Sequence, residues 1–259
     1  MSKSLTTIFV YAWDPYESAW PVFCYGLRKY WPDCPYPLVF ITNQLESPCG
    51  KTIKVGSINN FYQKMVLALE QIETPFILFM HEDYWIKDFV CTDNIKYYVS
   101  LLRQEIAEYI RLIPMPPPDR DFPLDNRLGI INTNSEYRVS FMASLWRVST
   151  LQNLMDPALS LWEHEKYGTR LSASYGERFL SVKKRSYGID YVATAISNRR
   201  WSKAAYEYVE KEGLFVDFSR LIPPPKYEVL VSDIRSIAYR VKRRIAKKMA
   251  RARATRTPG

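Results

Sequence analysis

Four short runs of consecutive apolar residues constrain the fold of this chain more than any other feature. They cover Ile8–Trp13, Pro37–Thr42, Phe76–Met80 and Leu128–Ile131, and apolar and polar residues do not alternate along them. Strands with one face in water alternate, whereas strands of a parallel sheet covered on both faces are apolar throughout. The runs therefore predict a mostly parallel sheet with helices on both sides.

Segments with a helical period lie between these runs and predict an α/β domain. Apolar residues recur at three- and four-residue spacing in three of these segments, residues 18–31, 59–72 and 93–109. Asn59 or Asn60 is a suitable N-cap for the second segment. A further helical segment, residues 201–213, is expected to end at Gly213.

The composition argues against two kinds of cofactor site. The nine glycines form neither GxGxxG nor GxxxxGK[ST], so a glycine-rich dinucleotide or phosphate loop is not expected. The four cysteines lack metal-type spacing and only two histidines accompany them, so structural zinc is not expected either. We expect free thiols in a reducing cytosol at Cys24, Cys34, Cys49 and Cys91.

The positive charge is concentrated at the C-terminal end. Ten of the 36 Lys and Arg residues lie within residues 235–256, which hold no acidic residue, while the other 26 nearly balance the 27 Asp and Glu residues. The proline-rich string LIPPPK (221–226) separates this end from the body. We therefore expect one domain over residues 1–226 and a basic, amphipathic helical tail over residues 227–259.

The tail is predicted to lie on an anionic membrane surface, because a narrow apolar stripe at helical spacing is surrounded by cations. A nucleic-acid-binding arm and a disordered, solubilising end are the alternatives. The nearly neutral body argues against nucleic acid as a partner. With no signal peptide or membrane-spanning run visible, the protein is expected in the cytoplasm, peripheral on the inner face of a membrane.

Polar side chains follow three of the predicted strands at the point where each strand ends. Asp14 follows the first, Asn43 the second, and His81, Glu82 and Asp83 the third. The carboxyl ends of parallel strands share one edge of the sheet, and ligands bind in the crevice there. We therefore expect these groups to converge on one rim.

Glu82 and Asp83 are adjacent carboxylates that repel each other, and burying either unpaired would be costly. A divalent cation relieves this repulsion, and hard oxygen ligands suit Mn²⁺ or Mg²⁺. Such a cation would also bind a diphosphate and stabilise charge on a departing nucleotide. An exposed turn or a helix cap is the alternative interpretation of the pair.

The chain resembles GT-A-fold glycosyltransferases that use nucleotide-sugar donors, especially small bacterial-type enzymes of surface polysaccharide synthesis. The more specific matches are VYAWDPYESAWPVFCYGLRKYWPDCPYPLVFITN (10–43) and NNFYQKMVLALEQIETPFILFMHEDYWI (59–86), and looser ones cover residues 144–168 and 196–220. The resemblance implies a GT-A-like, Rossmann-like sheet flanked by helices, and transfer of a sugar from a nucleotide diphosphate to an acceptor hydroxyl.

The resemblance also implies roles for particular residues. The ends of the first two strands would hold the nucleotide, through Tyr11, Ala12, Asp14, Thr42 and Asn43. The acidic motif HED takes the place of the family's DxD signature and departs from it at the first position, where His81 stands. Asp83 is then the expected ligand of metal and diphosphate, with Glu82 second.

An inverting transferase needs a carboxylate to take the proton of the acceptor hydroxyl, whereas a retaining enzyme does not, and both outcomes stay open. The resemblance places a catalytic acid near LWEHEKYG, which contains Glu163 and Glu165. Residues two apart face differently on a helix, so one of them is expected to reach the cleft, and we favour Glu165. A solvated first helical turn, where acids suit the helix dipole, is the alternative.

A diphosphate also calls for cationic partners. Lys64 lies near the start of a predicted helix, just before the acidic strand, and Arg199, Arg200 and Lys203 surround Trp201. Guanidinium groups fit phosphate oxygens in two-point contacts. Plain solvated surface is the alternative for each of them.

The expected function is glycosyl transfer to a glycan or lipid-linked acceptor, and two rivals remain. A sugar nucleotidyltransferase would share the fold but usually has a glycine-rich, basic phosphate loop, which VYAWDPYESAW lacks. A non-catalytic, basic-tailed membrane adaptor would keep only a vestigial cleft. Trp162 and Trp201 are candidates for stacking on a sugar, although a large aromatic residue is more often part of the core.

Overall fold

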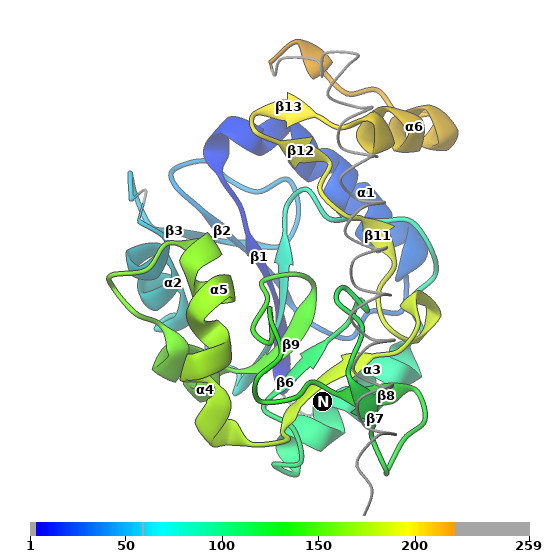
Figure 1. The fold of residues 1–259 in the computed structure, drawn as a ribbon. Helices are drawn as coiled ribbons and strands as arrows, with labels where there is room; N and C mark the ends of the chain where they lie inside the picture. Colours follow the sequence, from blue (N-terminus) through cyan, green and yellow to red (C-terminus); the bar gives the residue numbers. More distant parts are fainter. Residues whose placement is uncertain (1–3, 59, 221–259) are drawn as a thin grey trace, which may run out of the picture.

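The structure is a computed structural model and describes residues 4–58 and 60–220 (Figure 1). One mixed sheet of nine strands has the order β3-β2-β1-β4-β9-β6-β10-β8-β7. Its strands are β1 (Thr6–Tyr11), β2 (Leu38–Thr42), β3 (Lys51–Lys54), β4 (Phe76–His81), β6 (Tyr109–Arg111), β7 (Arg120–Asp121), β8 (Leu128–Ile130), β9 (Ser144–Arg147) and β10 (Phe179–Val182). Within this sheet only β8 and β9 run against the others. The predicted α/β fold with a mostly parallel sheet is confirmed.

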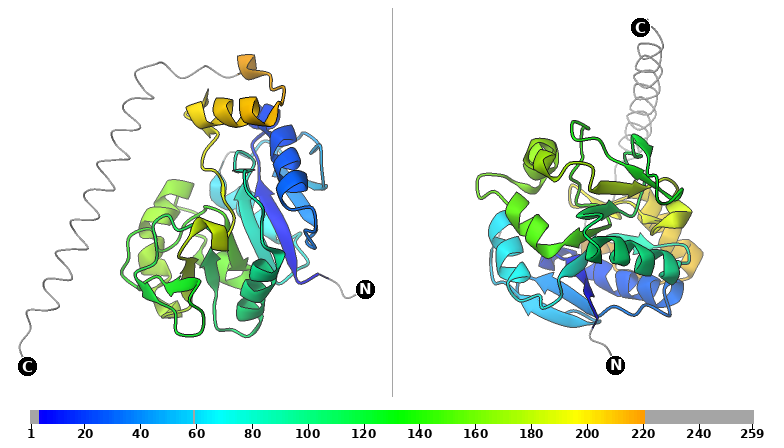
Figure 2. Two further views of the ribbon diagram at one scale, coloured as in Figure 1. Left: turned by 90° about the vertical axis from the view of Figure 1, so that its right-hand side faces the viewer. Right: turned by 90° about the horizontal axis from the view of Figure 1, so that it is seen from below.

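Helices cover both faces of the sheet (Figures 1 and 2). One face carries α1 (Trp20–Tyr30) and α3 (Thr92–Arg103), and the other carries α2 (Phe61–Leu69), α4 (Val148–Leu154) and α5 (Leu161–Leu171). The sixth helix, α6 (Lys203–Glu212), packs on α1, where its Glu212 accepts from Tyr25 and Tyr30. Short 3-10 helices are η1 (Asp14–Ala19), η2 (Ala173–Tyr175), η3 (Arg185–Tyr187) and η4 (Phe218–Arg220). The sheet is thus the middle layer of three.

The two-sided cover explains the apolar runs. In β1, Ile8 and Val10 pack in the core cluster that contains α1, while Phe9 between them packs in the cluster that contains α2. All three side chains are fully buried. Each such side chain contributes roughly 1.5–3 kcal/mol on burial, so a polar residue on either face of β1 would be costly.

Two local predictions about helix ends are confirmed. Asn60 caps α2, since its Oδ1 accepts from the amide of Gln63 at 3.0 Å. Gly213 ends α6 in the left-handed region at φ 65°, which glycine adopts without strain. The strand predicted at 128–131 is present as β8, and it runs antiparallel to β10. An apolar run predicts a strand but does not encode its direction.

Two two-stranded sheets lie beside the central sheet. The first pairs β5 (Trp85–Ile86) with β11 (Tyr191–Val192), and the second is a hairpin of β12 (Ile196–Ser197) and β13 (Arg200–Trp201). Both turn residues of the hairpin, Asn198 and Arg199, have positive φ, at 51° and 60°. These angles are those of a type I′ turn, which matches the twist of two-residue hairpins.

Two of the cysteines are joined in a disulfide, so the expectation of four free thiols is wrong. Cys24 of α1 bonds to Cys49 in the loop before β3, with their Cα atoms 6.2 Å apart. Cys34 and Cys91 are free. The pair meets because α1 packs beside β2, a proximity that the sequence spacing does not encode. The argument from free thiols for a reducing compartment therefore no longer holds.

The domain boundary at residue 226, the tail helix over residues 227–259 and its membrane contact all lie outside the described residues. Among the helices of residues 4–58 and 60–220, none combines the length and apolar character that crossing a bilayer requires.

Close packing at Gly168 fixes the position of α5. A Cβ at this residue would lie 2.5 Å from Cβ of Val139. We therefore expect Gly168→Ala to lower the free energy of unfolding by about 1–3 kcal/mol, as measured by urea denaturation. Lys166→Ala, at an exposed position of the same helix, is the control and should change it by less than about 0.5 kcal/mol. Equal midpoints for both variants would contradict this packing.

Candidate functional site

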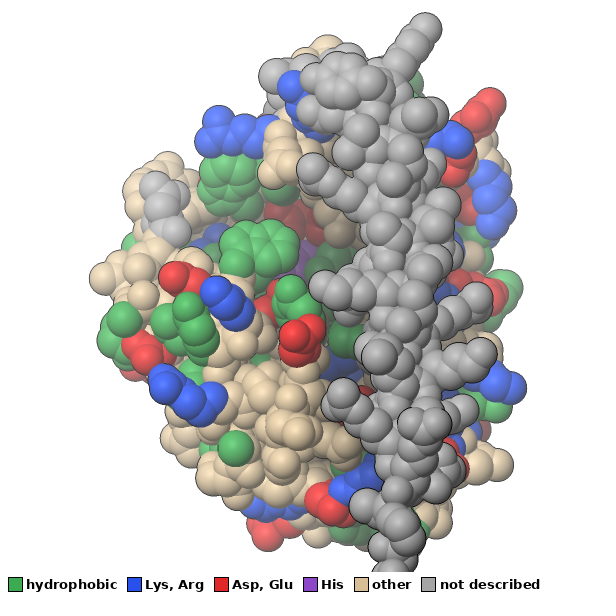
Figure 3. All heavy atoms as spheres, in the orientation of Figure 1, with side chains coloured by type: hydrophobic (Ala, Val, Ile, Leu, Met, Phe, Trp, Pro, Cys, Tyr) green, Lys and Arg blue, Asp and Glu red, His purple; other side chains and the backbone are tan. Residues whose placement is uncertain are grey.

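The strand ends predicted to converge do meet at one edge of the sheet. β1 pairs in parallel with β2 on one side and with β4 on the other. The amide of Trp13, after β1, donates to Glu82 Oε1, after β4, at 3.0 Å. Asp14 Oδ1 accepts from the amide of Asn43, after β2, at 2.8 Å. Acidic and histidine side chains are visible in a hollow among hydrophobic side chains near the centre of this face (Figure 3).

Asp14, Thr42 and Asn43, which were predicted to hold the nucleotide, form hydrogen bonds that stabilise the loop after β2. Asp14 Oδ2 accepts from the amides of Gln44 and Leu45, at 2.7 and 3.1 Å, in addition to the bond from Asn43. Thr42 donates to the carbonyl of Leu45, and Asn43 Nδ2 donates to the carbonyl of Gly56. Their polar side-chain atoms therefore hold the loop, and a nucleotide would meet the surface that they build.

Lys64 is an internal cation and does not present its ammonium at the surface. Its side chain is buried, and Nζ donates to the carbonyl of Ala12 and lies 4.7 Å from the centre of the Tyr11 ring. Burial lowers the pKa of Lys64 to about 8, although the charges of Glu82 and Asp14 oppose this shift. Lys64 thus acts on the acidic residues through charge, from beneath the site.

Glu82 and Asp83 lie at the expected edge but are covered, with exposed fractions of 4% and 7%. The cover comes from main chain on both sides. Trp13 donates to Glu82, while Ile196 of β12 donates its amide to Asp83 Oδ2 at 3.1 Å. The amide of Ala195 also donates to the carbonyl of Asp83. One oxygen of each carboxylate is therefore fixed, and in the described part of the chain no other residue donates a hydrogen bond to the second.

Burial raises the pKa of both carboxyl groups, and the charge of Asp83 raises that of Glu82 further. The folded protein therefore retains protons that the unfolded chain releases, starting from the ordinary values of 4.5 and 3.8. The pair contributes most stability at low pH and loses that contribution as the pH rises above this range. His81 stays neutral above about pH 4, because burial and Lys64 lower its pKa to about 4.

We expect Glu82→Gln to flatten the fall in unfolding free energy between pH 6.5 and 7.5, a range above the ordinary pKa of His81 and below the lowered pKa of Lys64. Chemical denaturation at several pH values measures this slope. The control is Glu207→Gln, whose exposed carboxylate pairs with Lys203, and it should leave the slope as in the wild type. A wild-type slope in Glu82→Gln would mean that Glu82 ionises normally in the folded protein.

His81 is the last residue of β4 and the member of the HED motif that reaches the surface most. Its side chain is 17% exposed. Its ring packs against those of Tyr11 and Tyr84, with centroids 5.6 and 5.0 Å away. Nδ1 of His81 lies 4.0 Å from Oε2 of Glu82, so a ring with a lowered pKa borders the acid pair.

The two glutamates of α5 face different ways, as predicted. Glu165 Oε1 accepts from Ser140 Oγ and from the amide of Phe141, at 2.9 and 2.8 Å. Glu163 instead forms a capping box with Ser160 at the exposed start of α5. Glu163 thus has the structural role that a first-turn acid often has, while Glu165 points toward the sheet.

Glu165 and the acid pair share one neighbour. Burial raises the pKa of Tyr84 well above its ordinary value, and the charges of Tyr191, Asp83, Glu165 and Glu82 raise it further. All three carboxylates therefore lie within electrostatic reach of the same phenol. The residues predicted to bind metal and diphosphate and the glutamate predicted as base therefore both act on Tyr84.

The cationic cluster after β12 is split by the fold. The guanidinium of Arg199 lies 5.5 Å from the centre of the ring of Trp13, whose backbone amide donates to Glu82. Arg200 is half-buried on β13, and Lys203 is exposed and paired with Glu207 at 3.3 Å. Trp201 is fully buried and belongs to the core. Of these three cations, Arg199 is therefore the one with a described contact to a residue bonded to the acid pair.

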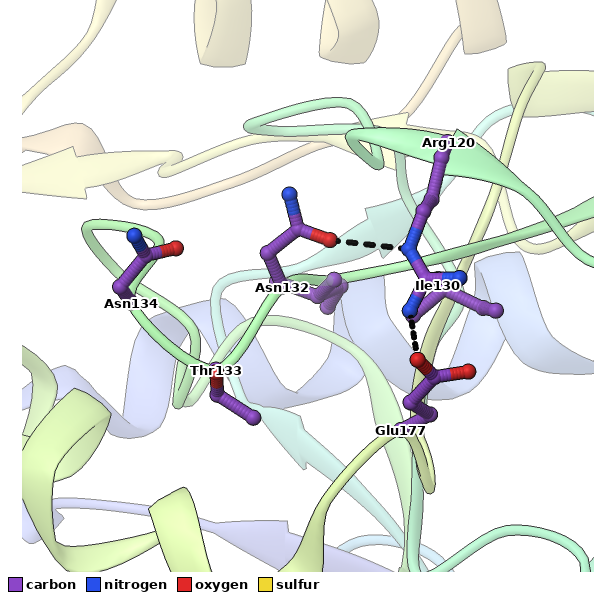
Figure 4. Close-up of a pocket in the computed structure, with 7 residues that line it drawn as sticks. Arg120, Ile130, Asn132, Thr133, Asn134 and Glu177 are labelled. Atoms are coloured by element: carbon purple, nitrogen blue, oxygen red, sulfur yellow. Dashed lines mark hydrogen bonds and ion pairs between the residues drawn. The ribbon is translucent and has the colours of Figure 1, made fainter.

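Neither Glu82 nor Asp83 lines the two cavities described here. One has a volume of about 520 Å³ and is lined by Tyr11, Asn60, Phe61 and residues 157–163. The other, of about 220 Å³, lies by β7 and β8 (Figure 4). In this smaller cavity Arg120 is bonded to Asn132 and paired with Glu177, so its charge is already balanced. The larger cavity is lined by two predicted site residues, Tyr11 and Glu163.

The described residues contain no cluster of three or more His, Cys, Asp or Glu side chains that would hold a metal ion. Glu82 and Asp83 offer two hard oxygen atoms at most from side chains that are already bonded once. This set fits Mg²⁺ or Mn²⁺ in kind but is too small to complete its shell, so water or a diphosphate would have to supply the remaining ligands.

No family model matches the sequence, and a search of curated proteins found no match either. Among solved structures, the chain is similar in fold to TarS 1–349 of S. aureus, at 14% identity and a TM-score of 0.49, over 80% of this chain and 64% of that one. It is also similar to a longer TarS structure, at 13% identity and a TM-score of 0.49, over 80% of this chain and 39% of that one. A cytidylyltransferase from Leptospira borgpetersenii matches at 13% identity and a TM-score of 0.40, over 66% of this chain and 72% of that one.

This chain therefore spans less than two thirds of the TarS chains that it matches. TarS 1–349 has been solved with UDP and with UDP-GlcNAc. At these identities and TM-scores the matches assign no activity to this chain.

Proposed function

We propose that this chain is a glycosyltransferase that binds a nucleotide-sugar at the edge formed by the ends of β1, β2 and β4. The observation that supports this most is the pair Glu82 and Asp83. It lies at the carboxyl end of a central strand, each carboxylate is fixed through one oxygen, and burial disfavours its charge. Such an arrangement is unfavourable for the fold alone and becomes favourable when cationic charge binds.

In this proposal Asp83, with Glu82, would hold Mn²⁺ or Mg²⁺ together with the donor diphosphate. The cation would supply the positive charge that neutralises the departing nucleotide. Arg199 lies beside Trp13 and can pair with a phosphate oxygen at the rim. The loop held by Asp14 faces the nucleoside. Tyr11 packs against His81, which borders Glu82, and in this proposal the donor approaches beside these rings.

Glu165 is the proposed base for the acceptor hydroxyl. It is fixed in orientation by Ser140 and Phe141 and shares the surroundings of Tyr84 with the acid pair. A carboxylate fixed in orientation within electrostatic reach of the donor site is a suitable candidate for the general base. Glu163 is occupied in the helix cap. On sequence grounds we further propose that the basic tail brings this site to a membrane-bound acceptor.

Thermal-shift measurements with UDP, GDP and CDP, each with and without Mn²⁺, test the proposal. We expect one nucleotide to raise the melting temperature, and more so with Mn²⁺, because a ligand of the folded state stabilises it. A panel of the corresponding nucleotide-sugars, UDP-GlcNAc included, then identifies the donor by release of nucleotide. No shift with any nucleotide would favour the non-catalytic adaptor.

A further inference from the structure

The larger cavity has a lining unlike that of the acid pair's surroundings. It is bounded by Tyr11 and Phe61, whose rings lie 5.4 Å apart, and by the chain that enters α5. At that entry Trp162 is 76% exposed, which is unusual for so large an apolar side chain. A cavity of about 520 Å³ with an aromatic wall is within the range of small-molecule sites.

The charge of this cavity excludes a phosphorylated ligand. Among the described residues that line it there is no Lys or Arg, and the one charged side chain is Glu163. Hydrogen bonds from Ser160 lower the pKa of Glu163, so it is an anion at neutral pH. A diphosphate would be repelled here. The ligand that fits is neutral, with an apolar face for the indole ring and hydrogen-bond donors for a carboxylate.

A pyranose ring has both properties. Its C–H face packs on the π face of an aromatic ring, while its hydroxyl groups donate to carboxylates. Glu163 uses Oε2 for the capping box, so Oε1 is left for a hydroxyl, and Asn60 uses Oδ1 as N-cap, so its Nδ2 is left as a donor. Both polar side chains lie at helix starts, which fixes their positions.

We propose that this cavity is a carbohydrate subsite, in which a neutral hexose unit of the acceptor stacks on Trp162 and hydrogen-bonds to Glu163 and Asn60. The proposal rests on the function proposed above, because Tyr11 both lines this cavity and packs against His81 beside the acid pair. A glycan held on Trp162 therefore lies next to the donor site, and Glu163 binds acceptor while Glu165 serves as base.

Saturation-transfer NMR with methyl hexosides and methyl N-acetylhexosaminides, at millimolar concentration and without nucleotide, tests this subsite on the full chain. We expect at least one glycoside to bind the wild type. Trp162→Ala should weaken it about ten-fold, and Trp162→Phe should retain most of it. Tyr167→Ala is the matched control, because Tyr167 is a second exposed aromatic residue of α5 that does not line the cavity.

Nucleotide binding, measured on the same samples, separates this inference from the proposed function. Trp162→Ala should bind nucleotide as the wild type does. Glycoside binding that depends on Trp162, in a protein that binds no nucleotide, would support the subsite and overturn the transferase. Absence of glycoside binding, or equal binding by Trp162→Ala, would overturn the subsite. Loss of nucleotide binding in Trp162→Ala would also overturn it, since the cavity would then hold the nucleobase.

Discussion

Asp83→Asn is expected to reduce release of nucleotide from the donor by on the order of 10²–10³-fold, the usual loss when a charge-stabilising group is removed. The protein should fold as well as the wild type or better. In the wild type the amide of Ile196 donates to Asp83 Oδ2 at 3.1 Å, and the asparagine Oδ1 can still accept this hydrogen bond. The charge repulsion between residue 83 and Glu82 disappears. Steady-state kinetics and urea denaturation on the same preparation measure both effects.

Loss of activity with unchanged or higher stability identifies a residue that the fold itself does not need. Asp125→Asn is the matched control. Asp125 accepts from the amide of Arg127 at 2.7 Å and also pairs with its guanidinium, away from the acid pair. This variant should lose stability and keep its activity. Normal turnover by Asp83→Asn would remove Asp83 from the site and the metal–diphosphate proposal with it.

The sequence predicted the centre of the fold better than its edges. β1, β2 and β4 are five- and six-residue strands buried on both faces, and their apolar runs are unambiguous. Strands of two to four residues, such as β6 and β10, are too short to show a period. Their places come from pairing, of β6 with β9 and β10 and of β10 with β6 and β8. The direction of a strand is set by its pairing with neighbouring strands, so the apolar run at 128–131 predicts a strand but not that β8 runs antiparallel to β10.

The site divides in the same way. The meeting of Asp14, Asn43 and Glu82 follows from strand ends and was predictable. The burial of Asp83 was not predictable. It is covered by main-chain amides at Ala195 and Ile196, and nearly every residue type has such an amide, so the sequence does not indicate where one will donate. A nucleotide-binding role for the 42–43 region remains a prediction, while the structure adds the contacts by which these residues hold their loop.

Breaking the Cys24–Cys49 disulfide should cost about 3.5 kcal/mol of unfolding free energy, the loop-entropy value for a closure over 25 residues. Cys24 is buried in α1, and Cys49 ends the loop that Asp14 anchors through Gln44 and Leu45. The bridge therefore restrains one wall of the proposed donor site as well as the fold. Urea denaturation with and without dithiothreitol measures the first effect, and nucleotide affinity under both conditions the second.

The double variant Cys24→Ala with Cys49→Ala separates this bond from other effects of reduction, since dithiothreitol should leave its stability unchanged. Cys34→Ala, at a free thiol, should respond to dithiothreitol as the wild type does. Under denaturing, non-reducing conditions the wild type should expose two alkylatable thiols, and four after reduction. Four thiols without reduction would show that Cys24 and Cys49 are merely close, and the loop would then be held by the hydrogen bonds of Asp14, Thr42 and Asn43 without a covalent restraint.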